Sequence, residues 1–356
     1  MCPHGGPVYA ELMAEGLTAE EVIDFSVCSN PFQPPLGVRE ILGTIAIDGY
    51  PDSEATELRQ CLSEKLQVAP ANILAGSGAM EIIRLVALAY FGYGDRVLIL
   101  EPTFGEYEVA CRIVGAEVIK YRGRVEESFA PMIEEVVSLI KQHQPRGVFI
   151  CNPNNPTGQY LSMREVEIIV DACGDGLLIL DEAFIAFTDE CWSSINLLSR
   201  GNVIVVRSMT KDYALAGLRL GYAMAGQEVI GSLRKVCPPW NVNVIAQKAG
   251  IIALRDGNYL KRCTEKIRQG NRFLTDELCR IGFTLVPSKT NFFLVKVGSG
   301  RKFHKALLKR GILVRDCTSF GLPEYVRIAP RTMLECRKLV TVIQELKRDG
   351  ELVDGA

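Results

Sequence analysis

Apolar residues recur along the chain in two alternating patterns. Short runs rich in valine, isoleucine and leucine have the length of buried strands, and the longer segments between them repeat apolar residues at helical spacing. They predict strands at residues 73–75, 96–100, 117–119, 147–151, 177–180 and 203–206, and helices at 54–66, 80–90, 132–143 and 163–173. Because strands and helices alternate, we expect an α/β protein whose mostly parallel sheet is buried on both faces.

The pattern changes after the proline-rich stretch 238–243. A long helical region over residues 244–281 follows, and then short strands at 292–297, 312–315 and 325–328 with a helix near 302–309. This order indicates a smaller α+β domain. The predicted division is a large α/β domain over residues 45–235, with an N-terminal arm (1–44) that joins a small C-terminal α+β domain (236–356). Residues 223–225 are expected to form an antiparallel strand at the edge of the large sheet.

Composition narrows the possible partners. The chain has 356 residues, of which 48% are hydrophobic and 23% are charged, as in an ordinary soluble globular protein. Its net charge of −2 gives no electrostatic reason to expect nucleic acid or an anionic membrane as partner, and no apolar run reaches the length of a membrane span. The 12 cysteines show no paired CxxC spacing and the 3 histidines are scattered, so we expect a cytoplasmic protein with reduced cysteines and no bound metal.

The first candidate for chemistry is Lys211, which closely follows the strand predicted at 203–206. Burial at a strand end disfavours the charged ammonium, and the neutral amine is a nucleophile. Ser208 and Arg219 nearby supply a hydroxyl and a guanidinium that suit a phosphate. A lysine amine beside a phosphate site suggests pyridoxal phosphate held as a Schiff base. The alternative is a solvated lysine after a strand.

Three further stretches favour the cofactor. Four aliphatic residues deliver Asp181 to a strand end, where an acid can pair with a pyridinium nitrogen; a helix N-cap or a metal ligand is the alternative. Asn152–Gly158 forms a rigid turn with two Asn-Pro pairs. Gly78 and Ala79 open a helix, whose first amides can bind phosphate. A nicotinamide cofactor fits less well, because the third glycine of the dinucleotide fingerprint is missing.

In combination, these motifs resemble the fold-type I pyridoxal-phosphate enzymes of the class I and II aminotransferase group. The resemblance runs from about residue 24 to about residue 331 and rests on Asn155–Gly158, Asp181–Phe184 and Ser208–Lys211 with Arg219. It implies an aspartate aminotransferase-like fold with a seven-stranded type of large sheet, and a homodimer. It also implies that Lys211 and Asp181 are catalytic and that the cofactor is bound by Gly78, Ala79, Phe104, Asn155, Ser208, Arg219 and, across the dimer, Tyr50.

Within this group the chain looks like the histidinol-phosphate aminotransferase branch, which includes the threonine-phosphate decarboxylases of cobalamin biosynthesis. Like those decarboxylases, it opens with His4, Gly5 and Gly6 and continues to an Asn-Pro pair at Asn30. The resemblance implies that Arg327 holds a substrate carboxylate and Arg315 a distal phosphate. His4 and Asn30 would share that anion pocket. Read alone, each arginine would be interpreted as a solvated residue of an edge strand, and it is the pair that favours the pocket.

The reaction itself is left open by the motifs. Phe184 stands where the family places a tyrosine that bonds to the cofactor. Together with the His-Gly-Gly opening, this departure favours decarboxylation of O-phosphothreonine. The alternatives are histidinol-phosphate aminotransferase, another class I or II amino-acid aminotransferase, or a protein that only binds the cofactor and regulates.

Overall fold

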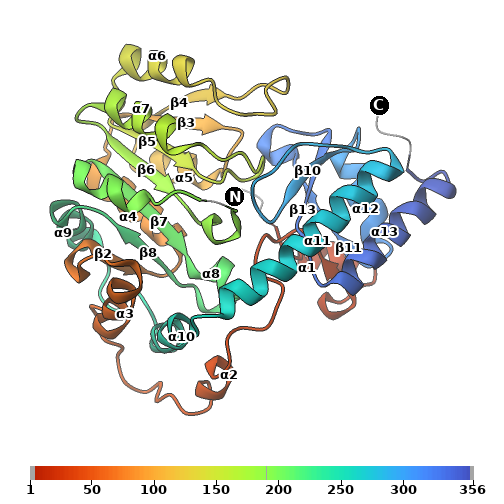
Figure 1. Cartoon of the computed structure of the whole chain (residues 1–356), viewed down its shortest axis with the longest axis horizontal. Coiled ribbons are helices and arrows are strands. Elements are labelled where there is room, and N and C mark those ends of the chain that lie inside the picture. Colours follow the sequence, from red (N-terminus) through yellow and green to blue (C-terminus); the bar gives the residue numbers. More distant parts are fainter. Residues whose placement is uncertain (1–4, 190, 353–356) are drawn as a thin grey trace.

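The computed structural model describes residues 5–189 and 191–352, and a seven-stranded sheet forms the centre of its larger unit (Figure 1). The strand order is β2-β8-β7-β6-β5-β3-β4. All neighbours from β7 to β4 are parallel, whereas β8 runs antiparallel to both β7 and β2. The bounds are β2 Ile73–Gly76, β3 Arg96–Glu101, β4 Glu117–Arg122, β5 Gly147–Cys151, β6 Leu177–Asp181, β7 Val203–Ser208 and β8 Gly221–Met224.

The position predicted for residues 223–225 is wrong in one respect. Strand β8 is antiparallel, as expected, but it lies second in the sheet and β2 forms the edge. Every residue of β8 is buried. A strand that is buried on both faces satisfies its backbone groups best when it has a hydrogen-bonding neighbour on each side, and β2 provides the second neighbour.

Helices cover both faces of the sheet, because the side chains of each strand alternate between two cores. On β6, for example, Leu178 packs in one core and Ile179 in the other. The first core is closed by α3 (Thr56–Leu66), α6 (Ile133–His143), α7 (Met163–Cys173) and α10 (Val244–Arg255). The second core is closed by α4 (Ala79–Tyr90), α5 (Glu106–Ile113) and α9 (Gln227–Val236).

A second sheet lies in the smaller unit, in the order β12-β13-β10-β9 and antiparallel throughout. The run predicted at 312–315 is divided: β11 pairs with the N-terminal β1, and β12 pairs with β13. The bounds are β1 Ile23–Asp24, β9 Thr284–Leu285, β10 Phe293–Lys296, β11 Ile312–Leu313, β12 Arg315–Asp316 and β13 Tyr325–Ile328. The helices that pack on it are α11 (Tyr259–Ile281), α12 (Gly300–Leu308) and α13 (Met333–Arg348).

The helical region predicted at 244–281 is two helices. It breaks between α10 and α11 at Asp256, Gly257 and Asn258, residues that favour turns over helix interiors. Helix α11 connects the two units, since Cys263 packs in the core of the large sheet and Leu274 in the small one (Figure 1). The predicted domain boundary at residue 235 stays a prediction.

The N-terminal arm contacts both units. Its helix α1 (Tyr9–Ala14) places Leu12 against Leu308 and Leu313 of the small unit. The short α2 (Val38–Ile41) instead lies beside α10 (Figure 1), and Val38 packs in the core of the large sheet. No helix in the described part of the chain is long and apolar enough to cross a membrane.

Candidate active site

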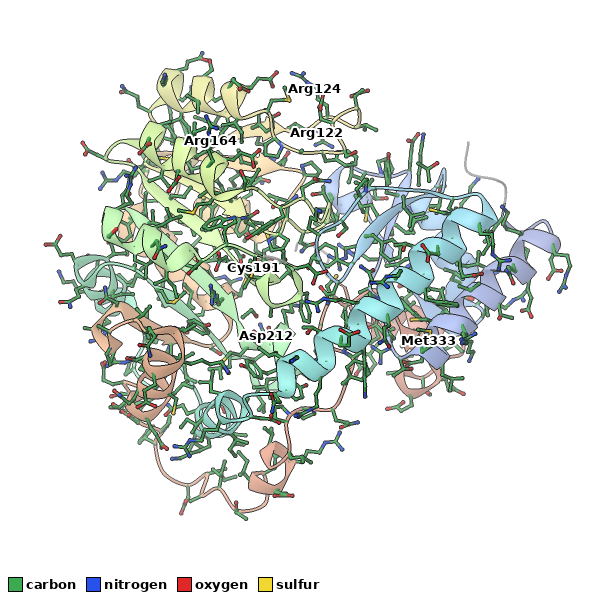
Figure 2. All side chains as sticks on the ribbon, in the orientation of Figure 1. Arg122, Arg124, Arg164, Cys191, Asp212 and Met333 are labelled. Atoms are coloured by element: carbon green, nitrogen blue, oxygen red, sulfur yellow. The ribbon has the colours of Figure 1, made fainter. Side chains whose placement is uncertain are left out.

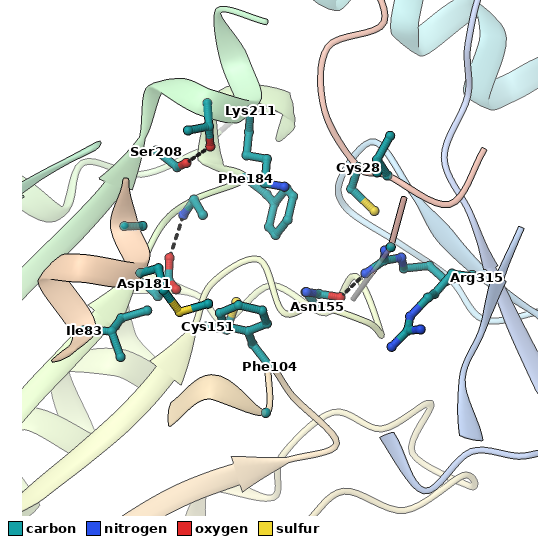
Figure 3. Close-up of a pocket in the computed structure, with 18 of the residues that line it drawn as sticks. Cys28, Ile83, Phe104, Cys151, Asn155, Asp181, Phe184, Ser208, Lys211 and Arg315 are labelled. Atoms are coloured by element: carbon teal, nitrogen blue, oxygen red, sulfur yellow. Dashed lines mark hydrogen bonds between the residues drawn. The ribbon is translucent and has the colours of Figure 1, made fainter. Parts of the chain in front are cut away.

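A cavity of about 250 Å³ lies where the carboxyl ends of β5, β6 and β7 face the small sheet (Figure 3). Parallel strands end at the same edge, so residues that follow different strands converge there. The sequence-predicted residues that line the cavity are Gly5, Ala79, Phe104, Asn155, Asp181, Ser208, Lys211, Arg219, Arg315 and Arg327.

Lys211 lies in α8 (Met209–Asp212), the single helical turn that follows β7, and its side chain extends into the cavity (Figure 3). Burial lowers the pKa of Lys211, an effect that Cys28 partly offsets. The positive charge of Arg327 lowers this pKa further. The amine lies 5.8 Å from the centre of the Phe184 ring. These surroundings favour the neutral amine, which can act as a nucleophile and as a base.

Asp181 is the last residue of β6 and its side chain faces the cavity. The Tyr107 hydroxyl donates to Oδ2 at 2.7 Å, and the Ala183 amide donates to Oδ1 at 2.9 Å. Burial raises the pKa of the Asp181 carboxyl, and these two donors lower it. The neighbouring Glu182 pairs with Arg207 at 2.9 Å and is absent from the cavity lining, so Asp181 is the acid available to a ligand.

The residues expected to hold a phosphate gather at the start of α4. The hydroxyls of Ser208 and Thr210 are 2.5 Å apart and both line the cavity beside Arg219. A Cβ atom on Gly78 would lie 2.9 Å from Nη2 of Arg219, and the φ of +81° at this position favours glycine in its own right. With the N-terminus of α4, these groups form a site for an anion.

Arg327 and Asn155 are joined by a buried hydrogen bond in which Nη1 donates to Oδ1 of the amide. The second nitrogen, Nη2, donates to the Ser26 carbonyl at 2.6 Å. Because Oδ1 of Asn155 accepts from the arginine, its Nδ2 remains a donor for a ligand. Arg327 is only 4% exposed, and its Nε has no partner among the described residues. The two hydrogen bonds hold the guanidinium at the wall of the cavity, where its charge suits an anion.

Arg315 and Arg327 are directly opposite each other in the register of β12 and β13. Directly opposed residues of an antiparallel pair point to the same face, so two guanidinium groups are brought together, which is unfavourable without an anion. Arg315 donates to Ser319 at 2.8 Å and stacks on Phe320 at 5.5 Å. Both arginines line the cavity.

The N-terminal glycines lie over this end of the cavity. The Gly6 amide donates to the Ser26 hydroxyl at 2.7 Å. A Cβ atom on Gly5 would lie 2.5 Å from the Ser26 carbonyl oxygen, so only glycine fits. His4, which we assigned to the same pocket, lies outside the described residues.

The assignment of Asn30 to the anion pocket is wrong. Its amide Nδ2 donates to the Asp212 carbonyl at 2.9 Å and to the Tyr259 hydroxyl at 3.1 Å. Its Oδ1 accepts from the Phe32 amide at 3.0 Å, and its backbone amide donates to the Lys211 carbonyl at 2.8 Å. Asn30 therefore has no donor left for a phosphate, and it holds the turn that carries Lys211.

Tyr50 lies away from the cavity, 81% exposed and stacked on Trp240 with 4.4 Å between ring centres. Among the residues of the site that the sequence analysis did not assign, three carry polar groups beside the predicted ones: Cys28 and Thr210 in the lining, and Tyr107 behind Asp181. Thr210 could have been identified from its place beside Lys211. Cys28 and Tyr107 reach the site through contacts between segments that are far apart in the chain, so no local sequence pattern indicates them.

The residues present fit pyridoxal phosphate. The site at α4 suits its phosphate, Asp181 its ring nitrogen, Asn155 its 3′-oxygen and Lys211 its aldehyde. Phe104 adds an aromatic wall beside the ring position.

Comparison with known proteins agrees with this fit. The family described as aminotransferase class I and II matches residues 22–343. The histidinol-phosphate aminotransferase of Akkermansia muciniphila is 31% identical over 346 residues, which are 96% of this chain and 94% of the relative. This name belongs to the function that the sequence analysis gave as its alternative.

Two solved structures show the same fold over nearly the whole chain. The histidinol-phosphate aminotransferase from Sinorhizobium meliloti, in complex with pyridoxal-5′-phosphate, has a TM-score of 0.88 at 24% identity and covers 98% of this chain and 95% of its own. The L-threonine-O-3-phosphate decarboxylase from Porphyromonas gingivalis has a TM-score of 0.79 at 27% identity and covers 91% and 99%. Aspartate aminotransferases share the same fold. The chain therefore belongs to the class I and II aminotransferases and is an enzyme that depends on pyridoxal phosphate.

Proposed function

We propose that the protein transfers an amino group between a phosphorylated amine of the histidinol phosphate type and a keto acid. The observation that carries this proposal is the opposed pair Arg315 and Arg327 at the cavity. Two guanidinium groups can hold the phosphate of one substrate and the carboxylate of the other. The names of the relatives that match nearly the whole chain support the same choice.

The residues of the chain supply the remaining steps. Bound pyridoxal phosphate supplies the electron sink that stabilises negative charge at the substrate Cα. The neutral Lys211 amine accepts the Cα proton and returns it as a general acid. With pyridoxal phosphate bound, Asp181 would accept a hydrogen bond from the ring nitrogen and keep it protonated. Nδ2 of Asn155 would donate to the 3′-oxygen.

Decarboxylation of O-phosphothreonine is the second candidate. Phe184, buried against Lys211, offers no hydroxyl at the position where the family carries a tyrosine. The N-terminal glycines, of which Gly5 lies close to Arg327, are the other feature that favours decarboxylation. Both reactions need the same phosphate site and differ in which Cα bond is broken.

Product analysis separates the two candidates. With histidinol phosphate and a keto acid, the purified enzyme should release the amino acid formed from that keto acid. With O-phosphothreonine alone, carbon dioxide and aminopropanol phosphate should be absent. The opposite result would establish the decarboxylase.

Arg315→Ala tests the phosphate site itself. A charge-assisted hydrogen bond contributes about 1.5–3 kcal/mol, so affinity for the phosphorylated substrate should fall roughly tenfold to a hundredfold. Affinity for the same amine without its phosphate should hardly change. Equal losses for both amines would mean that Arg315 is structural and that the substrate lacks a phosphate.

A further inference from the structure

Tyr107 is a buried residue of the site to which neither the motifs nor the proposed reaction assign a role. It is the second residue of α5, and it is 0% exposed. Its hydroxyl donates to Oδ2 of Asp181 at 2.7 Å, across 74 positions of sequence. The Tyr107 hydroxyl of α5 therefore bonds to the carboxylate at the end of β6.

Two aromatic neighbours hold the Tyr107 ring in the orientation that points its hydroxyl at Asp181. It stacks on Phe149 of β5 with 4.8 Å between ring centres and 11° between planes. On its other side it meets Phe104 at 5.6 Å and 81°, an edge-to-face contact. Because both neighbours are aromatic and the ring is closely packed, turning the hydroxyl away from Asp181 would disrupt this packing.

The hydrogen bond has a defined donor. Burial raises the pKa of Tyr107 well above its usual value, and the charge of Asp181 raises it further, so the phenol keeps its proton. A carboxylate oxygen has two lone-pair positions. Tyr107 occupies one on Oδ2 and the Ala183 amide occupies one on Oδ1. The carboxylate is thereby fixed in orientation, with acceptor capacity left for a ligand.

The same phenylalanine that borders Tyr107 also borders the ligand. Phe104 lines the cavity, three positions before Tyr107. Tyr107 therefore contacts both side chains that the cofactor ring would meet, Asp181 at its nitrogen and Phe104 on its face. A tyrosine that only filled the core would need neither contact.

We propose that Tyr107 is a positioning residue for the cofactor, which orients the Asp181 carboxylate toward the pyridine nitrogen and holds Phe104 against the ring. This inference concerns how the cofactor is bound. It holds for amino transfer and for decarboxylation alike, so failure of the proposed function leaves it untouched.

The test compares two cofactors on one variant. Tyr107→Phe keeps the ring and removes the hydroxyl. The full chain, freed of cofactor, is titrated with pyridoxal phosphate and with its deaza analogue, in which the ring nitrogen is replaced by carbon. The variant should bind pyridoxal phosphate roughly tenfold to a hundredfold more weakly than the unchanged protein, the loss expected for one hydrogen bond to a charged group. Its affinity for the deaza analogue, which cannot bond to Asp181, should stay within about twofold.

The control is Tyr121→Phe. Tyr121 is also buried, and its hydroxyl accepts from the Met132 amide at 2.8 Å, but it does not line the cavity. This variant should bind both cofactors as the unchanged protein does. Thermal unfolding of each cofactor-free protein reports folding separately, and the ratio of the two affinities cancels any loss of folded protein.

Two outcomes would overturn the proposal. An equal loss for both cofactors would show that Tyr107 shapes the cavity without acting through Asp181. Unchanged affinity for both would show that the Asp181 carboxylate keeps its orientation without the phenol. A shift in the pH dependence of the bound cofactor's absorbance, confined to Tyr107→Phe, is the further result expected if Asp181 has lost a donor.

Discussion

Lys211 and Asp181 meet in the cavity with pKa values that burial moves in opposite directions, down for the lysine and up for the acid. Burial disfavours charge in both, and the two groups partly restore each other's charge. The amine is thus available for chemistry, and the donors Tyr107 and Ala183 favour the ionised form of the acid. Each group owes its state to neighbours that come from other segments.

Replacing the lysine tests this state. Lys211→Ala should remove the cofactor adduct that borohydride reduces and lower turnover by at least about 10²–10⁴-fold, the range for loss of a general base. Peptide mapping after borohydride treatment of the unchanged protein should locate the adduct on Lys211. An adduct on another lysine in either protein would refute the assignment.

Asp212 provides a pH-dependent prediction. It lies at the end of α8, near the start of α11 (Figure 2), and burial raises its pKa to about 7 from 3.8. The folded protein therefore keeps a proton that the unfolded chain releases, so this residue lowers stability as pH rises from about 4 to about 7. Asp212→Asn removes the titrating group.

Thermal unfolding at two pH values checks this sign. The gain in melting temperature of Asp212→Asn over the unchanged protein should be larger at about pH 7.5 than at about pH 4.5. Asp175→Asn, on an exposed aspartate, is the matched control and should change little at either pH. A gain that is larger at the lower pH would mean that Asp212 is ionised in the folded protein.

The segment between β4 and α6 joins the two units. It inserts Phe129 among Leu294, Cys317, Leu322 and Tyr325 of the small unit, and the Phe129 and Tyr325 rings meet edge to face at 5.7 Å. At the start of this segment, Arg122 (labelled in Figure 2) donates to the Gly321 carbonyl at 2.9 Å. Gly321 follows Phe320, which stacks on Arg315. The large unit therefore holds the strand and turn that place Arg315 in the cavity.

Phe129→Ala should weaken that hold. Truncating a buried phenylalanine costs about 3–5 kcal/mol. We expect denaturant unfolding to show a loss of this order, and the KM for the phosphorylated substrate to rise because the Arg315 turn loosens. Val125→Ala is the control from the same segment, since Val125 is 54% exposed, and it should stay within about 0.5 kcal/mol. Normal KM in a destabilised Phe129→Ala protein would show that the segment does not support the site.

The arrangement of the whole chain leaves apolar side chains exposed on the segment 36–50 and near the proline-rich stretch 238–243. Tyr50 is 81% exposed, Leu36 89%, Ile47 75% and Trp240 46%. Exposed apolar groups that gather in one region mark an interaction surface. Tyr50 does not line the cavity of its own chain, and its role across a homodimer stays a prediction.

Mixing two inactive variants tests the homodimer. If Tyr50 of one protomer serves the site of its partner, a Tyr50→Phe protomer paired with a Lys211→Ala protomer has one site with both lesions and one intact site. Activity should therefore rise when the two variants exchange subunits. An active monomer in sedimentation, or no gain on mixing, would contradict the prediction. A mixture of the unchanged protein with Lys211→Ala shows how readily subunits exchange.

Local patterns in the sequence were enough for strands β2 to β7 of the large sheet, for helices α3, α4, α6 and α7, and for the residues at the ends of β6 and β7. They did not predict α5, which carries Tyr107, or α9. A short β-branched run specifies a buried strand wherever it lies in the sheet, and the ends of parallel strands meet at one edge. Asp181, Ser208 and Lys211 are therefore expected at one edge of a parallel sheet, and they converge because β6 and β7 are neighbours in it. The glycine before the helix start predicted a phosphate site at Gly78 and Ala79, whereas the approach of Arg219 to Gly78 appears only in the folded chain.

Strand order, register and hydrogen-bond partners depended on the folded chain. The register of β12 against β13 sets Arg315 opposite Arg327, and β2 places β8 in the interior of the sheet. Packing against Phe149 places the Tyr107 hydroxyl at Asp181. The side chain and backbone amides of Asn30 donate to the carbonyl groups of Asp212 and Lys211. These contacts join segments far apart in sequence, so burial and competition for partners decide them, and no pattern within one segment carries that information.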